Sequence, residues 1–378
     1  MQRTEHPLLS QSLGSQKTLV AFQFGDPLAR PKVYVQASLH AGELPGMLVA
    51  HHLRGILEQA AAEGRMTGQV VLVPAANPIG LAQRIDHHVQ GRFEFGTSEN
   101  FNRHYPDLAQ AIGADVLGRL GEDPASNVAL VRSAMQQWLE QWSPANELDS
   151  LRRRLLLLAH DADLVLDLHC DGESVMHLYC EEPCWPAMKP LAQLLQCQAV
   201  LLARDSGGGP FDERLSGIWW QLAERVEATG RMAPLPQACA STTVELRGEG
   251  DVLHTLARPD AQAIAQYLVH AGVMRAEAQP LPALRCEPTP LAGSQTLRAE
   301  LPGVLVYRVQ PGQRVHAGEV VAEVIDPTAP GASHVHEVKS AVDGVLYAIV
   351  RDRYLQAGGE VGKVAGAKAF RTGDLLGA

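Results

Sequence analysis

The sequence predicts an α/β domain with a largely parallel or mixed sheet, followed by a smaller, barrel-like β domain. Three observations lead to this fold class. Strand-like and helix-like segments alternate over most of the chain. Prolines then gather in residues 279–290, which is typical of a link between domains. After this link, short β-rich segments are separated by glycine turns and show no helical spacing. We therefore place the two domains at residues 1–284 and 285–378.

Each element of the first domain is predicted from its apolar pattern. Apolar runs bounded by turn-forming residues predict strands at residues 32–39, 70–74, 163–169, 174–180, 198–203 and 242–246. Helical spacing predicts helices at residues 45–62, 148–160, 211–229 and 259–273. Pro45 supports the start of the first helix, because proline is tolerated in a first turn.

The second domain is expected to contain strands at residues 303–307, 318–325 and 344–350. It resembles a biotinyl/lipoyl half-barrel, a fold that carries its modified lysine on a tight hairpin. Here the corresponding hairpin, residues 326–334, contains no lysine, and Lys339 lies outside its tip. We therefore expect an unmodified barrel that shapes a pocket or an oligomer contact.

Composition narrows the class of protein. The chain has 378 residues and a formal net charge of −10, and an acidic surface repels phosphate backbones, so we expect no nucleic-acid partner. Six cysteines without C-x-x-C spacing favour reduced thiols in the cytoplasm. The first residues show no apolar run, so no signal peptide is expected. No stretch reaches the ~18 apolar residues of a membrane span, so we expect no membrane partner.

The main candidate site combines His40, Glu43 and His169. His40-Ala-Gly-Glu43 follows the first strong strand, and His169 ends a later one. Strand ends that face the same edge of an α/β sheet gather ligands. Two histidines and one carboxylate, with water in the fourth position, form an open catalytic zinc site. Taken alone, these three residues leave a structural role for the histidines about as plausible as metal binding.

Further motifs strengthen the metal interpretation. They are H-x-x-E at His40 and Glu43, Asn77-Pro-Ile-Gly80, the pair Asn102-Arg103, Asp167-Leu-His169 and Thr243-Val-Glu-Leu246. With these five motifs in this order, residues 30–275 resemble the succinylglutamate desuccinylase/aspartoacylase family, a branch of the zinc carboxypeptidase-like fold. The resemblance implies a mixed sheet flanked by helices, a smaller β domain after it, and one zinc ion per chain.

The resemblance also implies roles for single residues. His40, Glu43 and His169 correspond to the zinc ligands, and Glu245 to the catalytic carboxylate. Asn102 and Arg103 correspond to the pair that holds the substrate's carboxylate. An arginine upstream of this pair polarises the scissile carbonyl, and both Arg92 and Arg84 compete for that role. We prefer Arg92, because it lies nearer to the Asn-Arg pair.

Simpler roles remain open for several of these residues. Glu245 could form an ion pair with Arg247, and Arg103 could pair with Asp107 on the surface. Asp167 points to the same face as His169 and could orient that ligand or serve a structural purpose. The glycine-rich segment 206–210 could be a loop over the pocket. The histidines of segments 86–88 and 334–336 are expected to be exposed.

The leading hypothesis is a zinc-dependent amidohydrolase that removes an acyl group from an N-acyl amino acid or a similar small molecule. The alternative is a zinc carboxypeptidase that acts on a peptide or a cell-wall fragment. A binding protein without catalysis is a third hypothesis, but such a protein is expected to have lost Glu245 or a metal ligand. The family often forms dimers, so a homodimer is also expected.

Overall fold

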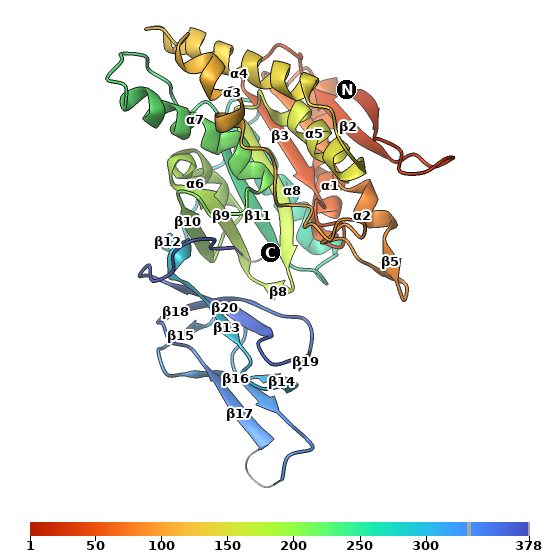
Figure 1. Cartoon of the computed structure of the whole chain (residues 1–378), viewed down its shortest axis with the longest axis vertical. Helices are drawn as coiled ribbons and strands as arrows, with labels where there is room; N and C mark the ends of the chain where they lie inside the picture. Colours follow the sequence, from red (N-terminus) through yellow and green to blue (C-terminus); the bar gives the residue numbers. More distant parts are fainter. Residues whose placement is uncertain (331–333, 377–378) are drawn as a thin grey trace.

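The computed structural model describes residues 1–330 and 334–376. Its larger part is a nine-stranded mixed sheet with helices on both faces, which confirms the predicted fold class (Figure 1). The central strands β4, β3, β7 and β11 run parallel, and β9 joins β11 in the antiparallel sense. In sheet order, the strands are β1 (Gln2–Pro7), β2 (Thr18–Phe24), β4 (Gln69–Val73), β3 (Lys32–Ala37), β7 (Leu164–Asp171), β11 (Ala240–Gly248), β9 (Met176–Glu181), β10 (Ala199–Ala203) and β12 (Thr289–Pro290).

Two hydrophobic layers hold the helices to the sheet. Neighbouring residues in a strand point to opposite faces, so Tyr34 packs into one layer while Val33 and Val35 pack into the other. One face carries α1 (Pro45–Ala62), α6 (Trp185–Leu194) and α8 (His254–His270). The other face carries α3 (Leu108–Leu117), α4 (Pro124–Gln141), α5 (Glu147–Ala159) and α7 (Phe211–Glu227).

The predicted elements are present, with shifted boundaries and several additions. Helix α8 begins at His254, five residues before its predicted start, and Pro259 lies inside it. Strands β1 and β2 and helices α3, α4 and α6 were not predicted. Strand β1 is polar and mostly exposed at the sheet edge, so it lacks an apolar pattern. No described helix has both the length and the apolar composition needed to cross a membrane.

The smaller part of the molecule is all-β and lies below the large sheet in Figure 1. One of its sheets contains β13 (Ser294–Arg298), β20 (Glu360–Gly366), β18 (Gly344–Ile349) and β15 (Arg314–Val315). The other contains β17 (Val335–Lys339), β16 (Val320–Ile325), β14 (Gly303–Tyr307) and β19 (Tyr354–Leu355). The tip of the predicted hairpin 326–334 includes residues 331–333, which lie outside the described residues.

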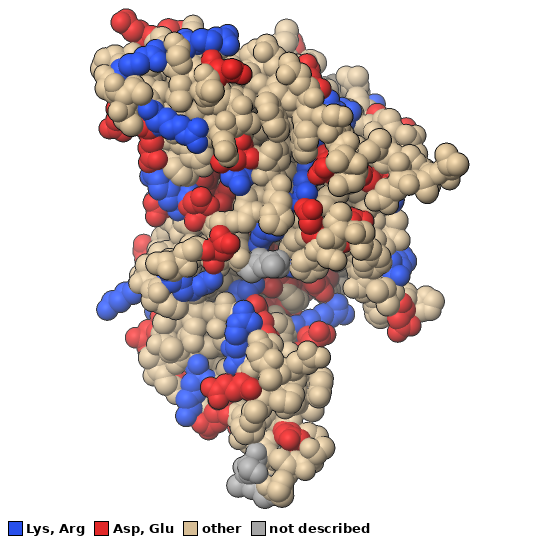
Figure 2. Space-filling view, in the orientation of Figure 1, with Lys and Arg blue, Asp and Glu red and all other residues tan. Residues whose placement is uncertain are grey.

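Where the two parts meet, each contributes a short strand to a sheet of the other. The short strand β8 (Glu173–Ser174), which directly follows β7, pairs with β18 of the smaller part. Conversely, β12 lies beyond the predicted boundary at residue 284 but extends the large sheet beside β10. Acidic and basic side chains are interspersed over the face shown in Figure 2, and both signs gather where the two parts meet. This junction adjoins the carboxyl ends of the central strands.

Candidate metal centre and active site

His40 and Glu43 lie in the turn between β3 and α1. Glu43 stands two residues before Pro45, where α1 begins, so the start of the helix aims its carboxylate back toward His40. The motif that begins at Asn77 supports this turn, because Asn77 Nδ2 donates a hydrogen bond to Leu39 O at 2.8 Å. The same side chain caps the short helix α2 (Pro78–Ala82) by accepting from Gly80 N at 2.8 Å.

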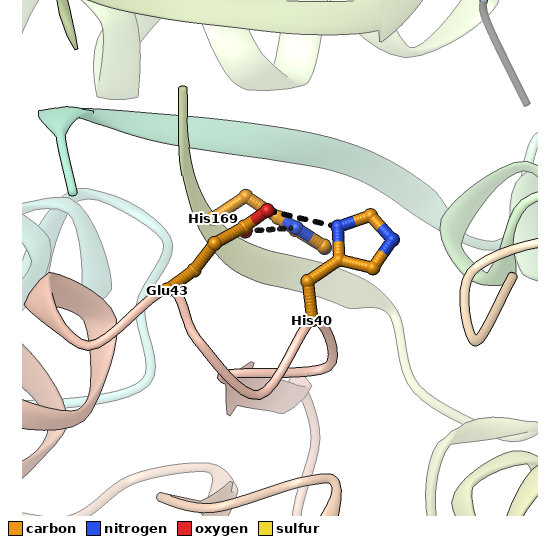
Figure 3. A group of neighbouring side chains, drawn as sticks. All are labelled: His40, Glu43 and His169. Carbon is orange, nitrogen blue, oxygen red and sulfur yellow. Dashed lines mark hydrogen bonds and ion pairs between the residues drawn. The ribbon is translucent and has the colours of Figure 1, made fainter. Parts of the chain in front are cut away.

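His169 comes from β7 and completes a cluster of three buried side chains. The Glu43 carboxylate contacts both imidazole rings (Figure 3). Its Oε1 lies 2.9 Å from His40 Nδ1, and its Oε2 lies 2.7 Å from His169 Nδ1. One ligand atom from each residue lies within 4.8 Å of the others. The three atoms therefore converge as the ligands of a single metal ion would.

The outer nitrogen of each ring has a polar neighbour. His40 Nε2 lies 2.8 Å from Asn100 Oδ1, which also accepts a hydrogen bond from Asn102 N. His169 Nε2 lies 3.1 Å from Asp167 Oδ2, a close ion-pair contact outside ideal hydrogen-bond geometry. A proton on Nε2 leaves Nδ1 as the lone-pair donor, which is the arrangement expected of metal-binding histidines.

The local charges favour an ionised Glu43. Burial alone would disfavour the charged carboxylate, but His40 and His169 outweigh it and lower the pKa of Glu43. The pKa of His169 shifts upward. Burial would lower it, but the negative charges of Asp167 and Glu43 outweigh burial. Two imidazole nitrogens and a carboxylate match the donor set of a catalytic zinc site, so these residues fit the metal that the sequence suggests.

Glu245 lies beside the cluster on the neighbouring strand. In the parallel pairing of β11 with β7, Glu245 stands opposite His169. Its Oε2 atom is buried and has no hydrogen-bond partner among the described residues. Burial and the nearby Glu43 raise the pKa of Glu245 to about 8. The predicted alternative of an ion pair with Arg247 does not form, because Arg247 pairs with Asp260.

A cavity of about 600 Å³ opens from these residues toward the junction of the two parts. It is lined by His40, Glu43 and His169, which we call the metal cluster, and by Glu245, Arg92, Asn102 and Arg103. Arg92 Nη1 lies 3.8 Å from Glu43 Oε1, which places the guanidinium beside the cluster. Arg84 lies outside this cavity, in an exposed hairpin where its Nη1 donates to His87 O at 3.2 Å.

The turn that contains His40 and Glu43, called the metal turn below, is contacted through backbone atoms by the loop that carries Arg92. Gly91 O accepts a hydrogen bond from Ala41 N at 2.9 Å. A Cβ atom on Gly91 would lie 2.4 Å from Gly42 N, which is too close for any side chain. The sequence shows the glycine but cannot show this contact, because the loop has no periodic pattern.

Asn102 and Arg103 are buried and fixed by their surroundings. Asn102 Oδ1 accepts from Phe211 N at the start of α7, so its amide nitrogen is the group that can donate to a ligand. Arg103 Nη1 donates to Asn102 O at 2.7 Å. Asp107, the predicted surface partner of Arg103, instead caps α3 and lies 3.8 Å from Arg214.

Sequence reasoning missed several residues that line or support this cavity. Asn100 lies two residues before the pair Asn102-Arg103, outside the motifs named from the sequence. Asp212 and Glu213 open α7, where burial raises their pKa values to about 6 and about 8. Tyr179 and Lys363 also line the cavity, but no local signal connects these distant segments.

Comparison with known proteins agrees with this geometry. The model of the succinylglutamate desuccinylase/aspartoacylase catalytic domain matches residues 29–271. A family protein of that description from Shewanella amazonensis is 27% identical, with a TM-score of 0.85 over 97% of this chain and 98% of its own. Its counterpart from Shewanella frigidimarina is 25% identical, with a TM-score of 0.83 over 96% of each chain. The product-bound ectoine utilization protein EutE (DoeB) from Ruegeria pomeroyi, 17% identical, shares the fold with a TM-score of 0.65 over 96% of this chain and 93% of its own. A search of curated protein sequences found no significant match.

Proposed function

The chain belongs to the succinylglutamate desuccinylase/aspartoacylase family, and we propose that it is a zinc-dependent amidohydrolase that removes the acyl group from an N-acyl amino acid or a similar small molecule. One observation supports this proposal most strongly. Glu245 stands opposite His169 in the sheet, and the same cavity contains the convergent ligand atoms of His40, Glu43 and His169. A carboxyl group whose buried Oε2 has no hydrogen-bond partner in the described part of the chain, beside the candidate metal ligands, suits a group that exchanges protons with substrate and water.

One zinc ion would be held by His40, Glu43 and His169. A bound zinc ion lowers the pKa of a coordinated water to about 7 and polarises carbonyl groups. The chain provides the rest of the chemistry. Glu245 accepts a proton from the attacking water and later delivers it to the amide nitrogen, so that the C–N bond breaks with a neutral amine as the leaving group.

Arginines complete the site at two places. Arg92 lies beside Glu43 and can donate to the scissile carbonyl oxygen as negative charge develops on it. Arg103, with the amide nitrogen of Asn102, can hold the carboxylate of the amino acid, because a guanidinium engages a carboxylate through two parallel hydrogen bonds. Arg84 has no role in this scheme, because it lies outside the cavity.

The expected partner is a small molecule, and the expected compartment is the cytoplasm. A cavity of about 600 Å³ has the volume of a small-molecule site. All six cysteines are free thiols, most of them buried, which fits a reducing environment.

Metal removal and one substitution test this proposal. The purified protein is expected to bind about one equivalent of zinc and to hydrolyse members of a panel of N-acyl amino acids. Chelation should abolish turnover, and zinc should restore it. Glu245→Gln should lower kcat by about 10²–10⁴-fold while retaining the metal. Full activity after chelation, or undiminished turnover by Glu245→Gln, would refute the proposal. Efficient cleavage of short peptides instead of N-acyl amino acids would favour the carboxypeptidase alternative.

A further inference from the structure

Beyond the last strand of the smaller part, the chain returns to the large part and borders the cavity. We call residues 370–376 the closing segment. Phe370 N and Arg371 N both donate to Ala292 O at 3.0 Å, which fixes its beginning. Leu375 N donates to Ser206 O at 2.8 Å, which fixes its end on the loop before α7. The closing segment therefore bridges the two parts of the molecule.

Arg371 braces the closing segment internally. Its Nη2 atom donates to Leu375 O at 2.6 Å, and its Nη1 atom donates to Ser294 O at 3.3 Å. Although Arg371 borders the cavity, both ends of its guanidinium are bound to backbone carbonyls. This arginine thus holds the segment in a compact turn, with Leu375 brought back toward β13.

The glycine-rich segment 206–210 receives the closing segment. Gly207 has a φ of +82°, which favours glycine over other residues. A Cβ atom on Gly207 would lie 2.1 Å from Asp374 Oδ1 and 2.8 Å from Asp374 Cα. Only glycine permits this close approach, so the loop and the closing segment fit each other at Gly207.

The leucines of the closing segment give the cavity an apolar wall. Leu375 and Leu376 both line the cavity. Together with Tyr179, they pack against a buried cluster that includes Leu291 and Tyr347. This cluster contains residues of both parts of the molecule, and the leucines cover it from the cavity side.

The apolar wall lies across the sheet from the metal cluster. His169 stands opposite Glu245 in the pairing of β7 with β11, and Thr243 stands opposite Tyr179 in the pairing of β11 with β9. All four residues line the cavity. A path over the sheet therefore leads from the metal ligands past Glu245 to Tyr179 and the two leucines.

We propose that the closing segment determines substrate selectivity by forming the apolar wall with Leu375, Leu376 and Tyr179, so that the substrate carries a short apolar group at the end distant from the metal. This inference rests on the proposed amidohydrolase function and specifies its substrate class. The apolar group is either the acyl chain or the amino-acid side chain. Both present the same chemistry to the wall, and the experiment below separates them.

Wild-type selectivity provides the first test. One arm keeps the amino acid constant and compares acetyl, butanoyl, hexanoyl and succinyl derivatives. The other arm keeps the acyl group constant and compares alanine, norvaline, norleucine and glutamate. In the arm that faces the wall, kcat/KM should rise about 3- to 5-fold per added methylene until the wall is reached and then fall. The charged succinyl or glutamate member should be at least about 10-fold poorer than the apolar member of similar length.

Substitutions provide the second test. Leu375→Ala with Leu376→Ala should shift the optimum toward longer chains, chiefly through KM, and raise the ratio of long-chain to short-chain kcat/KM about 10-fold. Gly207→Ala, which displaces Asp374, should disturb the same ratio. Leu301→Ala is the matched control, because Leu301 is 44% exposed and does not line the cavity. It should leave the ratio unchanged.

The possible outcomes are distinct. A preference for the charged members in both arms, or a ratio that does not move in either the leucine or the glycine variant, would overturn the inference while leaving the amidohydrolase intact. If a variant fails to fold, the wild-type series alone still decides the question. No turnover of any N-acyl amino acid by the zinc-loaded protein would refute the proposed function and this inference together.

Discussion

The two histidines of the metal cluster are oriented by different residues from different segments. His40 relies on Asn100, which also binds the backbone of Asn102, so one amide connects the metal cluster to the pair Asn102-Arg103. His169 relies on Asp167 from its own strand. A charged neighbour stabilises a metal-bound imidazole more strongly than a neutral amide does. Asp167 should therefore contribute more to metal affinity than Asn100.

The contact between Asp167 and His169 leads to a prediction about metal affinity. Asp167→Asn keeps the size of the side chain but removes the charge beside Nε2. Zinc affinity should fall about 10- to 100-fold, measured by competition with a chromophoric chelator. Asp115→Asn, an exposed aspartate on α3, is the control and should bind zinc as the wild type does. Equal affinity in both variants would show that Asp167 does not orient the ligand.

At the residue scale, sequence reasoning succeeded where a motif lay on a regular element. Asp167 and His169 share one face of a strand, so alternation alone placed them together. The structure brings Glu245 beside His169, as expected if their strands are neighbours. The choice between Arg92 and Arg84 could not be made from periodicity, because Arg84 lies in a hairpin strand of only two residues and Arg92 lies in an irregular loop. Only the backbone contact at Gly91 explains why Arg92 approaches the cluster.

At the scale of elements, short polar contacts support the ends of the strands. Asn77 binds Leu39 O and caps α2, so one side chain connects the residue before His40 to the start of α2. Its carboxamide is fully buried. Removing it would leave a buried carbonyl and a helix amide without partners, each of which costs free energy.

Asn77→Ala is therefore expected to lower both stability and metal affinity. The free energy of unfolding should fall by about 1–3 kcal/mol in denaturant titrations. Asn146→Ala offers a matched control, because Asn146 caps α5 by accepting from Asp149 N at 2.8 Å and does not line the cavity. The control should cost about 1 kcal/mol and leave zinc affinity unchanged. An equal effect of the two variants on zinc binding would contradict the role of Asn77.

Glu181 at the end of β9 leads to a prediction about pH. It accepts hydrogen bonds from Ser216 Oγ and from Trp220 Nε1 of α7. Burial and the nearby Glu213 nevertheless raise the pKa of Glu181 well above its ordinary value of 4.5. A carboxyl group with a raised folded pKa stabilises the fold below its unfolded pKa, and this contribution is lost as the pH rises through the folded value.

Thermal unfolding over a pH series tests this linkage. Stability of the wild type should decline as the pH rises from about 4.5 toward neutrality in part because Glu181 ionises. Glu181→Gln should remove that part of the decline and make the pH profile flatter. Glu227→Gln, at the exposed end of α7, should follow the wild-type profile. A variant profile as steep as the wild type would mean that Glu181 is already ionised at low pH.

The sequence predicted the buried elements of the large domain well and its peripheral elements poorly. Strands such as β3 and β7 are buried on both faces and rich in valine or leucine, so their runs are evident. Helices α3 and α4 begin at aspartate caps after irregular loops, α3 is short, and the buried face of α4 is a narrow row of residues. Helix α8 was predicted to start at Pro259, but it begins at His254 and includes Pro259 as an interior residue.

At the scale of the whole molecule, the smaller part contributes directly to the cavity. Lys363 of β20 pairs with Asp171 of β7 at 2.7 Å, two residues after His169. Tyr347 of β18 lies 3.4 Å from the Tyr179 hydroxyl. Sequence analysis expected a barrel that shapes a pocket or an oligomer contact, but no local pattern could show which strand faces which. The long-range ion pair depends on residues 192 positions apart.

Removing the positive charge of Lys363 should loosen the junction. Although burial opposes it, Asp171 raises the pKa of Lys363, which shows that the pair favours charge. Lys363→Met leaves Asp171 partly buried without its partner and should cost up to about 3–5 kcal/mol, measured by denaturant unfolding. The exposed pair Lys339–Glu337, 2.8 Å apart, is the control, and Lys339→Met should cost less than about 1 kcal/mol. Similar losses in the two variants would indicate that the junction does not depend on the ion pair.

The closing segment has a consequence for the timing of synthesis. A nascent chain can bring His40, Glu43, His169 and Glu245 together once the large domain has emerged from the ribosome, because domains fold in order of their appearance. The apolar wall forms only after Leu375 and Leu376 have been added and docked at Ser206 and Gly207. A chain that ends before the closing segment would thus hold the candidate metal ligands beside an unselective opening. The proposed selectivity is therefore acquired only once the closing segment has been synthesised and has docked on the large part.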